Sequence, residues 1–333
     1  MVETRKVQVT GGSTFTVSIP KSWANENNVA AGSVVEFYPE GDSLLLAPAT
    51  ENERTKGGLD ITGLSGEELK RAVMAMYVSG FDIISLESNR ISTAQRRTIR
   101  EATQSLVGLE VLEETRDCIV VQDLLDSSEL SIHNAVTRMR LIALSMLSDI
   151  VDALSTLDKD MARDVIQRDD DVDRLWMVVS RIFRATLRTP KAAEELGLER
   201  ETCFDYQSAA RQLERIADHA TKIGHLTLNF EQSVPSDVFN SLSDIQQDSE
   251  EIIDDGMNAL FTADSQEATD LANETREAVH EIDQRAREVD NLLRDLDPAR
   301  AQLLGLIVDS ISRSADYGGN IAETALQKAT PTP

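Results

Sequence analysis

The chain has 333 residues, 58 acidic against 33 basic side chains, and a formal net charge of −25. Its length favours two or three domains rather than one core. The charge excludes a protein that coats nucleic acid along its whole length, because phosphate contacts need Lys and Arg.

Other broad classes are disfavoured as well. Hydrophobic residues make up 41 % of the chain, enough to bury a core. The acidic excess is typical of halophilic proteins, in which concentrated salt screens repulsion. No apolar run approaches the roughly 20 residues of a membrane helix, and no signal peptide is visible, so we expect a cytoplasmic protein without a transmembrane segment. Cys118 and Cys203 match no zinc spacing and are expected to be reduced thiols.

Residues 1–50 are predicted to form a small β-rich domain, the head. Apolar residues alternate on both sides of Gly11-Gly12 within 5–19, which indicates a strand, a turn and a strand. Pro20 suits the start of a short helix, and 34–38 and 43–47 are expected to be two further strands. About fifty residues hold too little core to stand alone, so we expect the head to pair with a second copy.

The middle of the chain, 60–125, is predicted to be a small α/β unit. The preceding segment, 51–64, is polar and rich in Gly and is expected to be a linker. Capping boxes at Ser65 and Ser92 predict the starts of two helices. Three strands are expected at 81–86, 109–113 and 117–122.

From residue 129 onward the apolar spacing is three and four, which predicts about six helices. Breaks are expected near 157, 189–198, 235, 263 and 298. The segments 213–225 and 311–323 resemble each other, since Arg215 and Asp218 recur 98 positions later as Arg313 and Asp316. The simplest arrangement is two tandem three-helix bundles, at 129–230 and 234–330.

Four carboxylates of the first bundle form two i, i+4 pairs. Asp169 and Asp173 share one helix face, with Asp170 between them, and Glu214 and Asp218 share another. If the two helices pack together, the carboxylates converge. Oxygen ligands favour hard ions, so the expected cofactor is Mg, Mn or Fe. The alternative is a solvated acidic face on an acidic bundle.

The second bundle departs from this pattern. Ser312 stands where Glu214 stands in the first, so only Asp283 and Asp316 remain at matched positions. We expect this second metal site to be weak or absent. Gly318-Gly319 in the same bundle either permits close helix approach or kinks the helix.

A basic edge is confined to the first 24 residues. Arg5, Lys6 and Lys21 stand against one acidic residue there, a local charge of +2, and Ser13 and Thr14 follow the glycine turn. Backbone N–H groups and hydroxyls at such a turn can approach phosphate. The alternative is a dimerisation module with no role in DNA binding.

Two stretches resemble known families. Glu-Arg-Ile-Ala-Asp-His-Ala at 214–220, with Arg-Ser-Ala-Asp-Tyr at 313–317, resembles the signature of PhoU proteins, regulators of phosphate uptake. The stretch 6–48, with Gly-Gly-Ser-Thr-Phe-Thr-Val-Ser-Ile-Pro-Lys, is similar to the AbrB/SpoVT swapped-hairpin domain, a dimeric DNA-binding module. The pairing resembles archaeal PhoU-like regulators.

The resemblances imply a fold, partners and site residues. They imply tandem three-helix bundles whose E/D-x-x-x-D motifs hold metal, and a homodimer. The implied partners are DNA and the ATPase of the phosphate ABC transporter or a sensor protein. The implied DNA contacts are Arg5, Lys6, Ser13, Thr14 and Lys21.

The expected function is a regulator of phosphate uptake that couples a metal-binding helical module to a DNA-binding head. The alternative is an adaptor that holds the transport ATPase or a sensor, with the head serving only for dimerisation. An enzyme is not expected, because Gly11-Gly12 leads into a strand rather than a phosphate-binding helix and no Ser/His/Asp or Cys/His motif is present.

Overall fold

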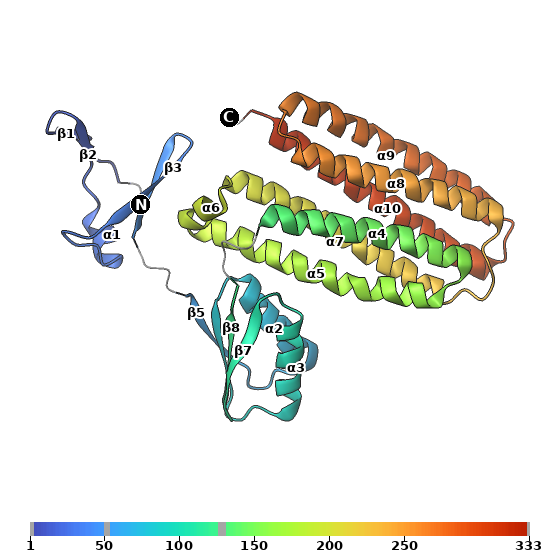
Figure 1. The fold of residues 1–333 in the computed structure, drawn as a ribbon, viewed down its shortest axis with the longest axis horizontal. Helices are drawn as coiled ribbons and strands as arrows, with labels where there is room; N and C mark the ends of the chain where they lie inside the picture. The colour runs from blue at the N-terminus through green and yellow to red at the C-terminus, as the bar shows by residue number, and fades with distance from the viewer. Residues whose placement is uncertain (1–2, 50–53, 126–130, 332–333) are drawn as a thin grey trace. The chain divides into compact units, whose positions relative to one another are not determined.

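The computed structural model describes residues 3–49, 54–125 and 131–331. The chain divides into two compact units, the first ending at Arg54 and the second beginning at Thr55. The first unit contains the head, and the second contains the α/β unit together with the helices that follow it (Figure 1).

The head consists of two separate antiparallel hairpins and one short helix. Its elements are β1 (Gln8–Thr10), β2 (Thr14–Thr16), α1 (Lys21–Glu26), β3 (Val35–Glu40) and β4 (Ser43–Pro48). Gly11 and Gly12 turn the first hairpin with φ of 65° and 84°, a region that favours glycine. None of the described residues 3–49 is buried, so the two hairpins make no core within one chain.

The α/β unit is a four-stranded sheet covered by two helices. Its elements are β5 (Lys56–Asp60), α2 (Gly66–Val78), β6 (Ile83–Glu87), α3 (Thr93–Gln104), β7 (Leu109–Glu114) and β8 (Cys118–Asp123). The strand order is β5-β6-β8-β7, with β5 parallel to β6 and the other pairs antiparallel. Its core includes Leu69 and Tyr77 from α2, Ile99 from α3, and Ile84 and Val121 from the sheet.

Two expectations for this unit were wrong. The predicted linker contains strand β5, whose two glycines give no strand signal. Gly57 is required in this strand because a Cβ at its position would lie 2.6 Å from the Phe81 ring. The capping box at Ser65 does not form, since its side chain makes no capping hydrogen bond, whereas the box at Ser92 with Gln95 does form.

The helical region contains six long helices and one short one among the described residues. These are α4 (Ile132–Thr156), α5 (Lys159–Arg188), α6 (Pro190–Leu196), α7 (Arg200–Thr227), α8 (Ser236–Phe261), α9 (Ser265–Leu293) and α10 (Pro298–Ala329). The predicted breaks near 157, 235, 263 and 298 are confirmed, whereas the predicted break at 189–198 contains the short helix α6. In the described part of the chain, no helix is long and apolar enough to cross a membrane.

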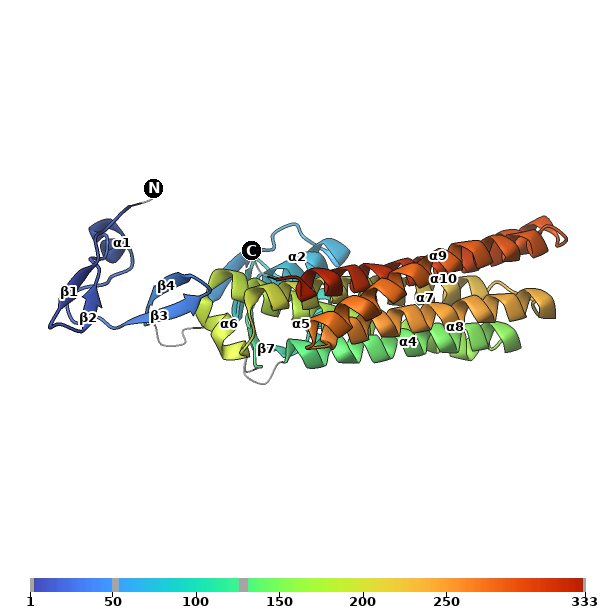
Figure 2. The ribbon, with the colours of Figure 1, turned by 90° about the horizontal axis from the view of Figure 1, so that it is seen from above.

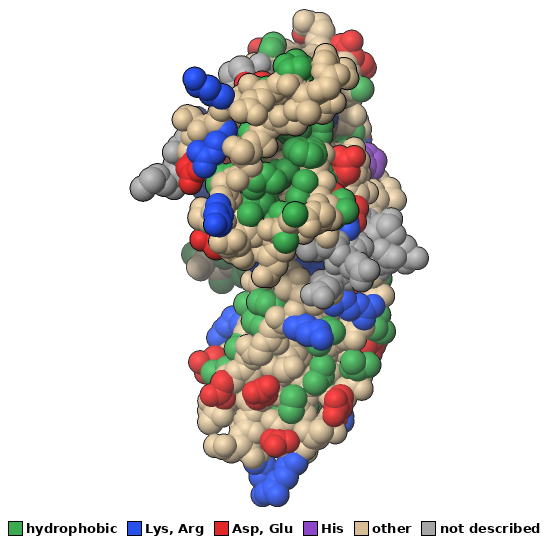
Figure 3. All heavy atoms as spheres, turned by 90° about the vertical axis from the view of Figure 1, so that its left-hand side faces the viewer, with side chains coloured by type: hydrophobic (Ala, Val, Ile, Leu, Met, Phe, Trp, Pro, Cys, Tyr) green, Lys and Arg blue, Asp and Glu red, His purple; other side chains and the backbone are tan. Residues whose placement is uncertain are grey.

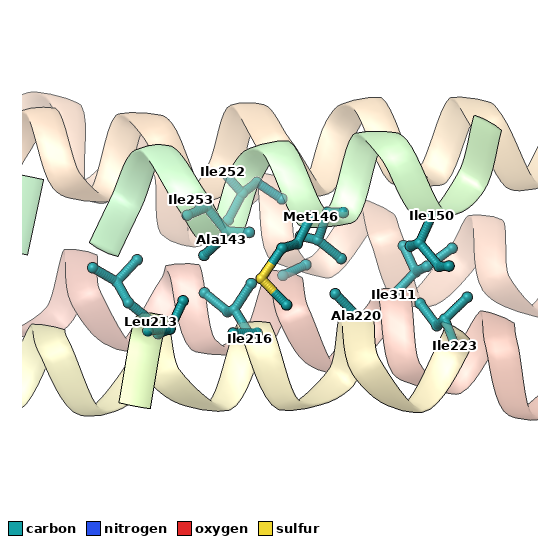
Figure 4. Close-up of a cluster of buried hydrophobic side chains, with 14 of the residues drawn as sticks. Ala143, Met146, Ile150, Leu213, Ile216, Ala220, Ile223, Ile252, Ile253 and Ile311 are labelled. Atoms are coloured by element: carbon teal, nitrogen blue, oxygen red, sulfur yellow. The ribbon is translucent and has the colours of Figure 1, made fainter. Parts of the chain in front are cut away.

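The long helices run side by side along one direction (Figure 2). Helices α4, α5 and α7 pack together, as do α8, α9 and α10, and the contacts of α7 with α10 and of α4 with α8 join the groups. One hydrophobic cluster spans both groups: it includes Met146 of α4, Ile216 of α7, Ile253 of α8 and Ile311 of α10 (Figure 4). The two predicted bundles therefore share a core.

The glycines of α10 allow close helix approach. A Cβ on Gly318 would lie 3.0 Å from the backbone of Ile253, and one on Gly256 would lie 2.7 Å from the Gly318 carbonyl oxygen. Helix α10 continues without a break through these positions. Of the two interpretations left open by the sequence, close approach is therefore the one observed.

Arg181 of α5 joins the α/β unit to the helical region. Its guanidinium donates to the Tyr77 carbonyl oxygen at 2.6 Å and to the carboxylates of Asp82 at 2.7 Å and Asp123 at 2.9 Å. Both Arg181 and Asp123 are buried, so this pair is a buried salt bridge between the α/β unit and α5 rather than a surface salt bridge.

Candidate functional site

Helices α5 and α7 place four carboxylates along their contact, here called the acidic cluster: Asp169 and Asp173 of α5, and Glu214 and Asp218 of α7. Apolar neighbours on the same helices are buried in the core, which brings the carboxylates to its edge. Glu214 is only 9 % exposed, Asp169 and Asp173 are half-buried, and Asp218 lies at the solvent-exposed rim.

The carboxylates of the acidic cluster hold protons more tightly than usual. Burial raises the pKa of Glu214 to about 7, and the negative charge of Asp218 adds to this effect. Burial and the charges of Asp173 and Asp218 raise the pKa of Asp169 to about 6. Burial also raises the pKa values of Asp173 and Asp218. The mutual effects show that the two predicted pairs face one another.

Of the predicted ligands, Asp170 does not join the acidic cluster. Its side chain is exposed, although its charge raises the pKa values of Asp169 and Asp173. It lies one position beyond Asp169, and consecutive residues of a helix do not share a face.

Three cations at the acidic cluster were missed by the sequence reasoning. Arg215 of α7 lowers the pKa values of Glu214 and Asp218 through its charge. Arg211 donates to Glu214 Oε1 at 2.7 Å, and its guanidinium carbon lies 5.4 Å from the centre of the Trp176 ring. Lys70 of α2 lowers the pKa of Asp173 through its charge. The i, i+3 spacing of Arg211 and Glu214 was a usable signal, whereas Lys70 comes from another part of the chain.

The donor set fits a hard cation in its chemistry. All four groups offer carboxylate oxygens, and Glu214 Oε2 is buried without a hydrogen-bond partner. The arrangement is not a preformed metal site, however. Among the residues that the structure describes, no three or more His, Cys, Asp or Glu side chains are grouped so that they could hold a metal ion.

The matched position in the second bundle holds fewer carboxylates. Asp283 is exposed, and its charge raises the pKa of the half-buried Asp316, so the two lie near each other. Arg313 donates to Asp316 at 3.2 Å. The hydroxyl of Ser312, which replaces the carboxylate of Glu214, is buried without a partner.

The five predicted DNA-contact residues all lie on the surface of the head. Arg5 and Lys6 precede β1, Ser13 and Thr14 lie at the turn into β2, and Lys21 begins α1. Arg5 forms an ion pair with Glu3. In the described chain, no hydrogen bond or ion pair joins any two of the five, so a single copy does not gather them into one site.

The head also exposes large apolar side chains. Val9 and Phe15 lie opposite each other across the first hairpin and are 62 % and 75 % exposed. Val7, Val17, Val34, Phe37 and Leu44 are exposed as well. Figure 3 shows hydrophobic side chains gathered over the head. A surface of this kind marks an interface.

Comparisons with known proteins identify both parts of the chain. Residues 136–227, from α4 to α7, match the family model of the PhoU domain. Over helices α4 to α7 the helical region is therefore similar to a PhoU domain. The match includes all four residues of the acidic cluster. Residues 8–54 match the model for "Antidote-toxin recognition MazE, bacterial antitoxin", which corresponds to the predicted AbrB-like head.

One solved structure of a PhoU protein has a fold similar to that of the helical region. PhoU from Pseudomonas aeruginosa is 20 % identical, with a TM-score of 0.52 over 60 % of this chain and 96 % of that one. The phosphate transport system regulatory protein PhoU from Streptococcus pneumoniae is 18 % identical, with a TM-score of 0.48 over 59 % of this chain and 91 % of that one. No curated protein matches the chain. The predicted architecture of a small β-rich head, an α/β unit and tandem helical bundles is confirmed.

Proposed function

We propose that this protein is a regulator of phosphate uptake whose PhoU domain binds a divalent cation and whose head, as a homodimer, binds DNA. The observation that carries the proposal is that the PhoU-domain match and the acidic cluster coincide on α5 and α7. The proposed protein partner is the phosphate transport ATPase or a sensor protein. The role is regulatory rather than enzymatic.

The electrostatics of the acidic cluster support metal binding. Four carboxylates on one helix contact repel one another, and a divalent cation would remove that repulsion. Mg²⁺, Mn²⁺ or iron suits an oxygen-only donor set. When bound, the ion would supply positive charge that draws α5 and α7 together through their carboxylates.

Metal content tests this part of the proposal. Asp218→Ala removes one of the four carboxylates and is expected to lower the metal bound per chain. Asp171→Ala is the matched control, because Asp171 is an exposed aspartate of α5 outside the acidic cluster. Equal metal content in wild type and both variants would contradict the metal site.

The exposed apolar side chains of the head support a dimer. Covering one large apolar side chain contributes about 1.5–3 kcal/mol, and the described head has no core of its own to supply this. A second copy offers the same apolar surface in a self-complementary arrangement. Pairing also doubles the basic edge from +2 to +4, where the contacts to DNA phosphates are proposed.

DNA binding is tested by fluorescence anisotropy with promoter fragments of phosphate-uptake genes. The variant Arg5→Ala/Lys6→Ala is expected to bind more weakly and with a smaller salt dependence. The slope of the logarithm of the binding constant against the logarithm of the salt concentration should fall in magnitude by about 0.9 for each phosphate that the variant no longer neutralises. A control, Lys159→Ala/Arg184→Ala, removes the same charge from exposed positions of α5. Equal binding by wild type and the head variant would remove the proposed surface.

A second candidate function is an adaptor that holds the transport ATPase or a sensor and does not bind DNA. It is favoured by the charge of the whole head, since residues 1–55 carry four basic and seven acidic groups, a net charge of −3. Absence of DNA binding by the dimeric wild type, together with co-purification of the transport ATPase, would select this function.

A further inference from the structure

Arg211 is held over the acidic cluster by two contacts from different helices. On its own helix it donates to Glu214 Oε1 at 2.7 Å. From α5, the Trp176 ring supports its guanidinium at 5.4 Å, a cation–π arrangement. The side chain of Arg211 is 42 % exposed, so it can leave this position without opening the core.

The charge of Arg211 reaches most of the cluster. It lowers the pKa values of Asp173, Glu214 and Asp218, three of the four carboxylates. A cluster of carboxylates without metal is compensated by such a cation or by bound protons. Arg211 therefore supplies, in the metal-free chain, part of the positive charge that a bound ion would supply.

Arg211 leaves one oxygen of the same carboxylate without a partner. Glu214 Oε2 is buried and has no partner, while Oε1 accepts from Arg211. An ion bound to Oε2 would lie within the width of one carboxylate group of the guanidinium. Two positive charges at that separation repel, so binding of the ion disfavours the arrangement of Arg211 seen here.

The second bundle supports this pairing of roles. The positions 98 residues beyond Arg211 and Glu214 are Asp309 and Ser312. The counterparts of Arg211 and Glu214 are therefore both absent from the second bundle, where Arg313 pairs with Asp316 instead, as expected if Arg211 serves the acidic cluster rather than the packing of α7.

We infer that Arg211, supported by Trp176, is a tethered competitor of the metal and sets the affinity of the acidic cluster for divalent cations. The inference rests on the metal binding proposed above. It assigns Arg211 a positioning role. The guanidinium balances the negative charge of Glu214 and the neighbouring carboxylates until a metal ion displaces the guanidinium.

The test is titration calorimetry of Mn²⁺ into full-length protein stripped of metal with EDTA and dialysed. Arg211→Gln is expected to bind Mn²⁺ about tenfold more tightly than wild type, which corresponds to about 1.4 kcal/mol. Arg211→Lys keeps the charge and is expected to bind within about twofold of wild type. Arg163→Gln is the matched control, because Arg163 forms an i, i+3 pair with Asp160 at 2.6 Å elsewhere on the surface.

The outcomes separate this inference from the metal proposal. Binding by wild type with the same or a weaker affinity in Arg211→Gln overturns the role of Arg211 and leaves the metal site intact. Binding by Arg211→Gln alone supports the competition in its strongest form. Binding by none of the proteins overturns the metal site and the inference together. If Arg211→Gln fails to fold, Arg211→Met, which keeps an apolar stem against Trp176, repeats the measurement.

Discussion

Replacing Glu214 by Gln is expected to stabilise the metal-free protein at alkaline pH. The pKa of Glu214 is raised from 4.5 to about 7, so the folded state binds its proton more tightly than the unfolded state does. Between pH 4.5 and pH 7 wild type therefore loses stability as the pH rises, because ionising Glu214 is harder in the folded protein. A glutamine cannot ionise, and Glu214→Gln removes this loss.

The size of the gain follows from the shift. A pKa change from 4.5 to about 7 corresponds to roughly 3 kcal/mol once Glu214 is fully ionised, which is an upper bound. The gain is smaller in practice, because the charged guanidinium of Arg211 then donates to a neutral amide oxygen instead of a carboxylate. We expect a net gain of about 1–2 kcal/mol, or an increase in Tm of about 2–6 °C.

The assay is thermal unfolding followed by circular dichroism in EDTA at pH 8 and pH 5. At pH 5 the side chain of Glu214 is protonated in the folded wild type and only a small part of the stability loss has accumulated, so the difference in Tm should be much smaller than at pH 8. Glu251→Gln, at an exposed position of α8, makes the same charge change and is expected to leave the pH dependence unaltered. A Tm gain of equal size at both pH values, or a lower Tm at pH 8, would refute the reasoning.

Three further predictions concern stability. Gly318→Ala should lower the free energy of unfolding by about 1–3 kcal/mol, seen as a lower Tm, because its Cβ would lie 3.0 Å from the backbone of Ile253. Arg181→Ala should lower the free energy of unfolding by about 3–5 kcal/mol and increase hydrogen exchange in the α/β unit, since Asp123 is left buried without its partner. The control Arg184→Ala, at an exposed position of the same helix, should change neither the free energy of unfolding nor the hydrogen exchange. The Tm of wild type should rise as KCl increases from 0.1 M to 1 M, because the net charge of −25 is screened over a shorter distance; an unchanged Tm would show that repulsion is not limiting.

Features set by nearby residues could be predicted from the sequence. The helix breaks are encoded locally: Leu157 ends α4 in the left-handed region with φ of 55°, and Asp297-Pro298 caps and begins α10. The i, i+4 carboxylate pairs follow from helical geometry alone, and the contact between α5 and α7 brings the two pairs to one helix interface.

Features set by distant residues could not be predicted. The role of Trp176 depends on how α5 is rotated against α7, and Lys70 approaches Asp173 because Arg181 fixes the α/β unit to α5. Strand β5 was missed because its pairing with β6, rather than its own residues, makes it a strand. The effect of Gly318 likewise depends on the helix that opposes it.

The lack of buried residues in the head has a consequence for regulation. A segment that gains its core only from a second copy folds and associates in one step, so its folded population depends on how much protein the cell contains. In the proposed dimer, the number of DNA-competent heads would fall with the square of the chain concentration when chains are scarce. The amount of the regulator would then be a signal in its own right, alongside any ion held at α5 and α7.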